Sequence, residues 1–98
     1  MQVDLDMYAE GAILLDGLEG AIIGIVEEFG NARRVLYSKQ KILEILCERD
    51  GMTYDEAEEF YDYNILGLHA SEQNAVFLDI LLQPELVDNS WKYFIKDI

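Results

Sequence analysis

Positive charge is scarce in this chain. Seven lysines and arginines face twenty aspartates and glutamates, so the net charge is −13 over 98 residues. Binding to nucleic-acid phosphates needs clustered Lys and Arg, and an excess of acid also repels anionic membranes. Direct contact with nucleic acid or with a membrane surface is therefore not expected. The charge favours a protein partner with a basic surface.

The residues that most often carry out catalysis are also few. Cys47 is the only cysteine, so no disulfide can form within the chain, and a reducing compartment is expected. Cys47 follows Leu46 with no electropositive motif that would activate a thiolate. His69 is the only histidine, and Glu72 is its one nearby acidic neighbour, across a predicted turn. We expect both side chains to be structural and the protein not to be an enzyme.

Metal-binding and phosphate-binding motifs are missing as well. The sequence has no paired cysteines or histidines and no glycine-rich phosphate loop. Asp50-Gly51 joins two predicted helices, but the chain continues with Met52-Thr53-Tyr54, which lacks the alternating oxygen ligands of an EF-hand. We expect no metal and no cofactor.

Long apolar runs are absent too. The longest candidate, residues 12–26, is interrupted by Asp16 and Glu19 and is too short to span a bilayer. The N-terminus is acidic, where a secretory signal would be basic. A cytoplasmic protein is expected. Because 51% of the residues are hydrophobic, the chain should fold, and residues 1–98 are expected to form one domain with a charged surface.

The first third of the sequence predicts one strand and one helix. Residues 3–7 alternate apolar and acidic side chains, which is typical of an edge strand. Residues 18–29 place apolar side chains at helical spacing, with Asp16 as a candidate N-cap and Gly30 as a candidate end. Residues 11–15 suit either a buried strand or the start of a helix.

The middle of the chain has clearer signals. Residues 35–37 predict a short strand, and Ser38 can cap a helix over residues 39–49 that Gly51 ends. Thr53 and Glu56 form a capping-box sequence, which predicts a second helix that ends near residue 64. Helical spacing predicts that this helix buries Ala57, Phe60, Tyr61 and Asn64.

The last third predicts two strands, at residues 67–70 and 75–80, joined by a polar turn at residues 71–74. Pro84 is expected to break the chain, and residues 88–90 to cap a last helix in which Trp91, Phe94, Ile95 and Ile98 share a face. A strand in which Trp91, Tyr93 and Ile95 alternate is the alternative. The predicted fold class is α+β, with three to four helices packed on a small antiparallel sheet.

The candidate functional site is an acidic helix face. Asp55, Glu59 and Asp62 fall at i, i+4 and i+7 on the predicted helix, and Glu58 lies beside them. Their spacing of about 5–6 Å along a helix is close to the phosphate repeat of one DNA strand, about two rises of 3.4 Å. These four residues are the predicted partner-binding site; the alternative is an ordinary solvated helix face.

One segment resembles a known family. The motif Asp50-Gly51-Met52-Thr53-x-x-Glu56-Ala57-x-Glu59-Phe60-x-x-Asn64-Ile65-x-Gly67 is similar to that of small acidic proteins of tailed phages and prophages, mostly of unknown function. The resemblance covers about residues 19–78. After Gly67 the family usually continues with an aromatic–Val–Gly turn, where this chain has Leu68-His69-Ala70. The resemblance implies a phage origin and transfers no catalytic residue.

Phages use small acidic proteins against host defences, which suggests a function by analogy. The first hypothesis is a protein-binding module, acting in the host cytoplasm, that docks like a DNA mimic on the basic surface of a host nuclease or nucleoprotein. It would be an inhibitor of the anti-CRISPR or anti-restriction kind. The alternative is a structural or regulatory phage protein that forms a homo-oligomer through apolar surface around Trp91 and Phe94.

Overall fold

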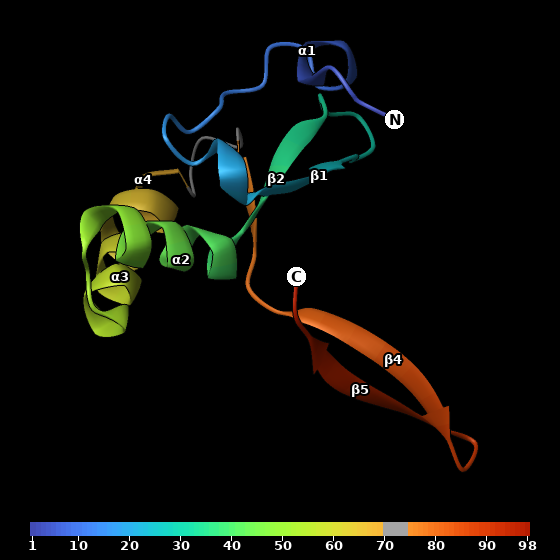
Figure 1. The fold of residues 1–98 in the computed structure, drawn as a ribbon. Helices are drawn as coiled ribbons and strands as arrows, with labels where there is room; N and C mark the ends of the chain where they lie inside the picture. The colour runs from blue at the N-terminus through green and yellow to red at the C-terminus, as the bar shows by residue number, and fades with distance from the viewer. Residues whose placement is uncertain (70–74) are drawn as a thin grey trace.

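The computed structural model of the protein describes residues 1–69 and 75–98 and belongs to the predicted α+β class (Figure 1). Its elements, in chain order, are α1 (Leu5–Tyr8), the 3-10 turn η1 (Glu19–Ala21), β1 (Ile22–Val26), β2 (Arg34–Ser38), α2 (Lys39–Asp50), α3 (Tyr54–Phe60), the π-helical segment η2 (Tyr61–Leu66), α4 (Gly67–His69), β3 (Ala75–Leu78), β4 (Leu81–Val87) and β5 (Ser90–Lys96).

The strands within the described residues form two separate sheets. A three-stranded sheet has the order β1-β2-β3, and β4 and β5 form an antiparallel hairpin of their own. Strand β1 is antiparallel to β2, but β3 runs parallel to β2, with Tyr37 opposite Phe77. The prediction of a single antiparallel sheet was therefore wrong. Parallel neighbours need a long crossover, and α2, α3, η2 and α4 lie in the connection between β2 and β3.

The helices in the middle of the chain start where their caps predicted. The Ser38 side chain accepts a hydrogen bond from the Lys41 backbone N–H at 3.2 Å, and α2 ends at Gly51 with a left-handed φ of +69°. The Thr53–Glu56 capping box of α3 is formed in full. Local side-chain chemistry therefore determines both helix starts.

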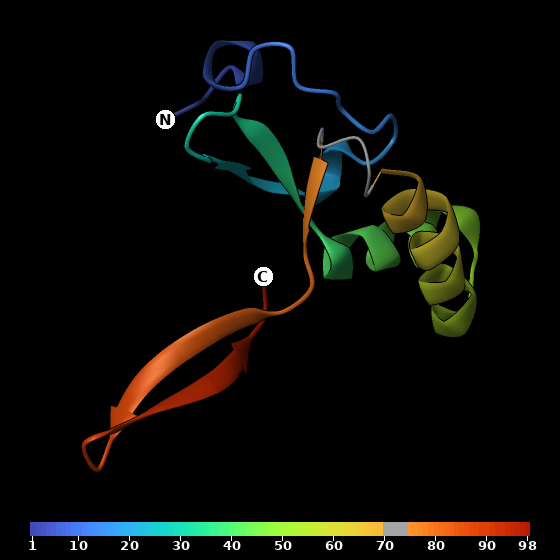
Figure 2. The same ribbon diagram turned by 180° about the vertical axis from the view of Figure 1, so that it is seen from behind.

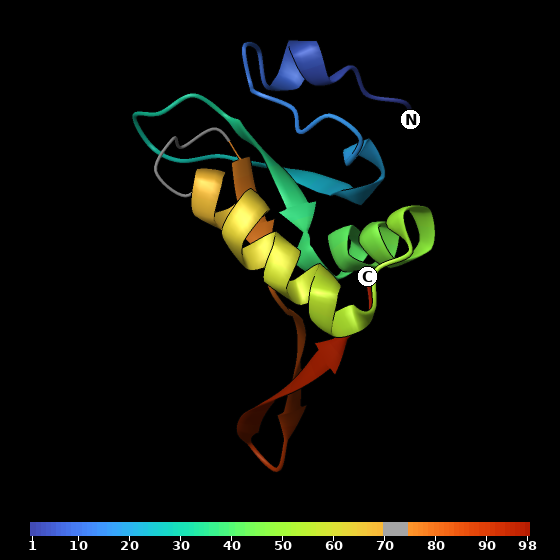
Figure 3. The same ribbon diagram turned by 90° about the vertical axis from the view of Figure 1, so that its left-hand side faces the viewer.

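The second of these helices is longer than predicted. Segments α3, η2 and α4 follow one another without a break from Tyr54 to His69, which Figure 3 shows as one helix in front of β3. In the π-helical part, the Gly67 N–H donates to the carbonyl oxygen of Asp62. The strand expected at residues 67–70 is helical over Gly67–His69, so that prediction was wrong there. The predicted turn at residues 71–74 lies outside the described residues.

Both predictions for the N-terminal third were wrong. Residues 5–8 form the short helix α1, because the Asp4 side chain accepts a hydrogen bond from the Asp6 backbone N–H. Residues 22–26 form β1, not a helix. Three isoleucines and a valine favour a strand there, and Gly20 and Gly24 weaken a helix.

The chain then reverses at Gly30, which has a φ of +82°. Gly30 therefore serves in the turn between β1 and β2 and does not end a helix. Ion pairs join Glu27 to Arg33 at 3.3 Å and Glu28 to Arg34 at 2.9 Å across this turn.

The predicted C-terminal helix is a strand, as the alternative interpretation held. Asp88 and Asn89 have φ values of +51° and +64° and form a two-residue turn between β4 and β5. Two successive positive φ angles are typical of the hairpin turn whose twist matches that of the flanking strands. Pro84 continues β4, which is possible because β4 has a free edge. Trp91 and Phe94 therefore do not share a face.

The hydrophobic core lies between the three-stranded sheet and the helices. The central strand β2 contributes Val35 and Tyr37, both fully buried. The Phe77 ring lies 6.0 Å from the Tyr37 ring and 5.7 Å, edge-on, from the buried Tyr61 of η2. Among the residues whose burial the structure describes, the remaining buried apolar ones are Ala9, Leu15, Leu18, Ala21, Ile42, Leu43, Leu46, Ala57, Ile65 and Ala75.

The hairpin of β4 and β5 projects away from this core, as Figures 1 and 2 show from opposite sides. The radius of gyration is 15.4 Å, whereas a compact domain of this length has about 13 Å. The residues of the two strands are exposed except for Leu81, which is half-buried. The hairpin therefore takes almost no part in the core.

Tyr37 offers a test of the core. Its hydroxyl oxygen accepts a hydrogen bond from the Leu15 N–H at 2.8 Å. We expect Tyr37→Phe to lower the free energy of unfolding by about 1–3 kcal/mol, because a buried donor loses its acceptor. Urea unfolding would measure the change. The control Tyr63→Phe alters an exposed ring and should stay within about 0.5 kcal/mol. Equal effects from both variants would contradict this role of Tyr37.

Candidate functional site: an acidic helix face beside a cavity

The orientation of α3 and η2 follows from what they bury. Ala57, Tyr61 and Ile65 recur every four residues and face the core. Phe60 and Asn64 lie off this row and are exposed, so the prediction that the helix buries them was wrong. Burial of the other row turns the acidic face of the helix toward solvent.

Three of the four predicted site residues lie together on that face. Asp55, Glu59 and Asp62 are exposed, at positions that share one side of the helix. Glu58 is half-buried, because it lies at the border between this stripe and a neighbouring cavity. We call Asp55, Glu59 and Asp62 the acidic stripe.

The start of the helix carries a further carboxylate in a defined role. The Thr53 N–H donates to Glu56 Oε1 at 2.9 Å, and the Glu56 N–H donates to Thr53 Oγ1 at 3.2 Å. The hydrogen bond from the Thr53 backbone stabilises the ionised form of Glu56 and lowers its pKa from the ordinary 4.5. Glu56 therefore stays charged in moderately acidic solution.

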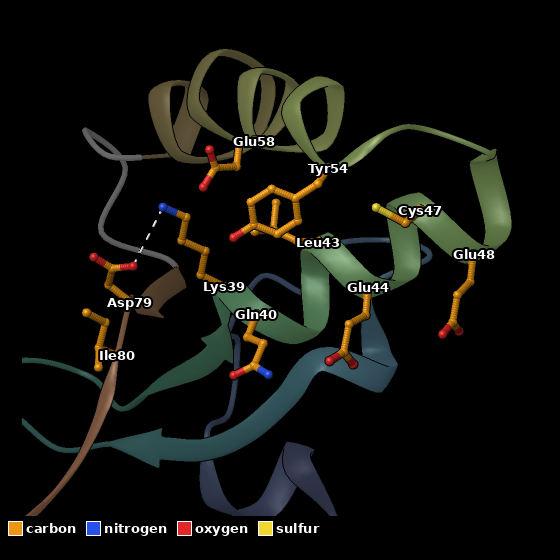
Figure 4. A pocket seen from close by; sticks show the side chains of 10 residues that line it. All are labelled: Lys39, Gln40, Leu43, Glu44, Cys47, Glu48, Tyr54, Glu58, Asp79 and Ile80. Atoms are coloured by element: carbon orange, nitrogen blue, oxygen red, sulfur yellow. Dashed lines mark ion pairs between the residues drawn. The ribbon is translucent and has the colours of Figure 1, made fainter. Parts of the chain in front are cut away.

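A cavity of about 530 Å³ lies next to the stripe, between α2, α3 and the residues that follow β3. In Figure 4, Tyr54 and Glu58 extend from α3 toward Leu43 and Lys39 of α2. Glu44 and Glu48 extend from α2 away from α3. The other lining residues are Gln40, Cys47, Asp79 and Ile80.

The charges around the cavity are mostly negative. Four carboxylates line it (Glu44, Glu48, Glu58 and Asp79), and Lys39 is the one positive charge among the lining residues that the structure describes. Leu43, Tyr54 and Ile80 add apolar surface. Such a cavity suits the apolar stem of a lysine or arginine side chain, with the charged end among the carboxylates.

The positive charge of Lys39 is held within the protein. Its Nζ lies 3.6 Å from Asp79 Oδ1 and 5.3 Å from the centre of the Tyr61 ring. Burial, aided by the negative charges of Asp79 and Asp62, raises the pKa of Tyr61 to about 12, so that its hydroxyl stays neutral. Lys39 thus joins α2 to the end of β3. Because its charge is paired with Asp79, it does not offset the other carboxylates around the cavity.

Sequence reasoning found the stripe but missed the cavity and the carboxylates on its other walls. Glu44 and Glu48 lie four residues apart on α2, a spacing that predicts a shared helix face. That signal was available in the sequence. The position of Asp79 depends on the parallel pairing of β3 with β2, which no local pattern indicates.

Cys47 is half-buried: it packs against the hydrophobic core and also lines the cavity. Within residues 1–69 and 75–98, no group of three or more His, Cys, Asp or Glu side chains is placed to hold a metal ion.

Among the helices of the same residues, none has the length and apolar character needed to cross a membrane.

Comparison of the chain with protein-family models, with curated proteins and with solved structures gives no match in any of the three. The resemblance to small acidic phage proteins therefore stays a prediction.

The capping box should determine the stability of the helix that carries the stripe. Thr53→Ala removes the acceptor of the Glu56 N–H, and we expect a loss of about 0.5–2 kcal/mol in the free energy of unfolding. Chemical denaturation would measure it. Unchanged stability would mean that this hydrogen bond does not contribute to folding.

Glu56 should give the stability a component that depends on pH. Its pKa is lower in the folded protein than its ordinary 4.5, so the unfolded chain binds more protons between the two values. The stabilisation is complete above pH 4.5 and is lost as the pH falls through the folded-state pKa. Glu56→Gln keeps a side-chain oxygen but has no charge to lose.

We therefore expect the wild type to exceed Glu56→Gln in stability at about pH 7, and the difference to shrink toward about pH 3. Urea unfolding of both proteins at each pH would measure this difference. Because the other carboxylates titrate in both proteins, their effects largely cancel. A difference that grows in acid would contradict the role assigned to Glu56.

Proposed function

We propose that this protein is a small acidic phage-type module that binds a host protein through the acidic stripe and the cavity beside it. Its partner carries a basic surface that normally binds nucleic acid, as in a nuclease or a nucleoprotein. The module acts in the host cytoplasm as a DNA mimic and inhibits a defence system of the CRISPR or restriction kind. No catalytic step is part of this proposal.

The observation that carries the proposal is the number of carboxylates on the stripe and around the cavity beside it. Asp55, Glu59 and Asp62 are exposed, and Glu58 leads from them into a cavity whose other walls carry Glu44 and Glu48. The helix from Tyr54 to His69 contains no lysine or arginine. Rows of basic residues that normally hold phosphates can pair with such a surface, and each fully covered pair contributes to specificity.

The cavity supports a second kind of contact with the same partner. It offers Leu43 and Tyr54 beside Glu58, so a long basic side chain can place its methylene groups on apolar surface and its charge at the carboxylate. A DNA-binding groove is rich in such side chains. The stripe supplies charge at roughly phosphate spacing, and the cavity supplies an anchoring point.

A phage structural or regulatory homo-oligomer is the second candidate function. The exposed apolar side chains of the β4–β5 hairpin favour it, because they suit association through apolar surface more than docking on a charged groove.

Reversing charges on the stripe would test the proposal. We expect Asp55→Lys with Glu59→Lys to slow association with the partner by an order of magnitude or more, with a smaller effect at high salt. The partner would be captured from a bacterial lysate, identified, and purified for kinetic measurement. Competition with duplex DNA for that partner is the decisive assay, because a DNA mimic displaces DNA.

The matched control is Asp6→Lys with Glu10→Lys. Both residues are exposed, and Asp6 belongs to α1, which lies on the far side of β1 and β2 from α3 (Figure 1). Asp4 is unsuitable as a control because it caps α1. Equal losses from the two double variants would show that only net charge matters. No loss from either, or no competition with DNA, would contradict docking through the stripe.

A further inference from the structure

The two faces of the β4–β5 hairpin differ in character. Side chains alternate between the faces along each strand, and directly opposed residues share a face. The register pairs Leu82 with Ile95, Pro84 with Tyr93, and Leu86 with Trp91. One face therefore consists of six apolar or aromatic residues.

The other face is mixed. It pairs Leu81 with Lys96, Gln83 with Phe94, Glu85 with Lys92, and Val87 with Ser90. Polar and charged residues hold five of its eight positions. The hairpin thus has the amphipathic pattern of a sheet that covers a hydrophobic core on one side only.

That apolar face has no cover within the described residues. Its five large residues range from 51% exposed at Leu82 to 74% at Ile95, with Trp91 at 61%, and Pro84 is exposed as well. Strands β4 and β5 contact chiefly each other, and Figures 1 and 2 show them extending away from the rest of the molecule. A two-stranded hairpin is at best marginally stable in water, and another layer on its apolar face would stabilise it.

We infer that the apolar face of this hairpin, formed by Leu82, Pro84, Leu86, Trp91, Tyr93 and Ile95, is the interface of a homodimer. Two hairpins pack face to face about a two-fold axis, so that the same patch of each copy meets the other. The interface does not depend on what the acidic stripe binds.

The exposed area is sufficient for a dimer. Aromatic side chains bury about 150–250 Å² each when fully covered. Trp91 and Tyr93 are 61% and 65% exposed, and Leu82, Leu86 and Ile95 are 51–74% exposed. Each copy therefore offers roughly 600 Å², or about 1,200 Å² for the pair, which reaches the lower end of stable specific interfaces.

The charge distribution favours a second copy as the occupant. Between Leu81 and Lys96 two acids, Glu85 and Asp88, balance two bases, Lys92 and Lys96, whereas the whole chain carries −13. Two neutral hairpins can approach without the repulsion that two acidic bodies would feel. A basic partner would gain no attraction from this element.

Two hairpins could also associate by pairing their edge strands, but the strand edges favour packing of the apolar faces instead. Edge pairing of two hairpins would join their apolar faces into one larger uncovered surface. Pro84, which lies midway along β4, has no N–H to offer at that edge. Packing the faces together covers the apolar side chains of both copies at once.

The oligomeric state of the purified full-length chain tests this inference. We expect light scattering coupled to size exclusion to give the mass of a dimer at micromolar concentrations. Trp91 is the only tryptophan, so its emission should shift to shorter wavelength as the dimer forms. High salt should leave the dimer intact or strengthen it, because repulsion between two chains of charge −13 is screened.

Trp91→Lys should abolish the dimer while far-ultraviolet circular dichroism retains the helical signal of the α2–α4 region. Tyr93→Lys gives the same test with the tryptophan probe in place. Phe94→Lys is the matched control, because it changes a 49% exposed aromatic residue on the opposite face of β5. We expect Phe94→Lys to remain dimeric.

Three results would overturn the inference. The first is a wild type that stays monomeric with solvent-exposed Trp91 emission at every concentration. The second is a dimer that survives both Trp91→Lys and Tyr93→Lys. The third is loss of the dimer in Phe94→Lys to the same extent as in Trp91→Lys, which would place the interface elsewhere on the hairpin.

Discussion

The packing of three aromatic rings, two of them buried and one half-buried, determines how the parts of this protein fit together. Tyr37 of β2 packs on Phe77 of β3, and the rings of Phe77 and Tyr61, which is on the long helix, meet at nearly a right angle. Offset and edge-on aromatic pairs contribute about 0.5–1.5 kcal/mol beyond the area that they bury. Through them the parallel strands and the helix form one core, and Lys39, over the Tyr61 ring, brings Asp79 to the same point. The orientation of the acidic stripe and the exit of the hairpin both follow from this packing.

Local sequence signals predicted the middle of the fold well and its two ends poorly. The helix starts at Ser38 and Thr53 depend on hydrogen bonds to residues three positions away, and both are present. Residues 22–26, by contrast, have apolar spacing that also suits a helix, and they become a strand because β2 offers a partner. Where the apolar spacing of a segment suits both a helix and a strand, pairing with a distant segment determines which of the two forms. At the C-terminal end, the positive φ angles of Asp88 and Asn89 produce a hairpin from residues that also suit a helix cap.

The candidate site, too, was predicted only in part. The stripe could be predicted because helical spacing alone places Asp55, Glu59 and Asp62 on one face, and burial of Ala57 and Tyr61 turns that face outward. The cavity could not be predicted, because it needs the packing of α2 beside α3 and the return of the chain at Asp79. Its walls come from three segments that local patterns do not bring together. The π-helical segment was also missed, since the bond from Gly67 to Asp62 leaves no distinct pattern in the side chains.

The acidic stripe and the apolar face of the β4–β5 hairpin lie on separate elements of the fold. They differ in the force that would bring a partner to each of them. Attraction to the stripe is electrostatic and weakens as the salt concentration rises. Association through the hairpin depends on the apolar area that is buried, and salt does not weaken it. If both act, one dimer presents two acidic faces. A target with two basic sites would then bind the second face at a high effective concentration, without any new contact. That gain requires a geometry in which both sites can be reached, so the orientation of the hairpin relative to α3 would limit the targets that benefit. The same chain would otherwise bind through one face at a time.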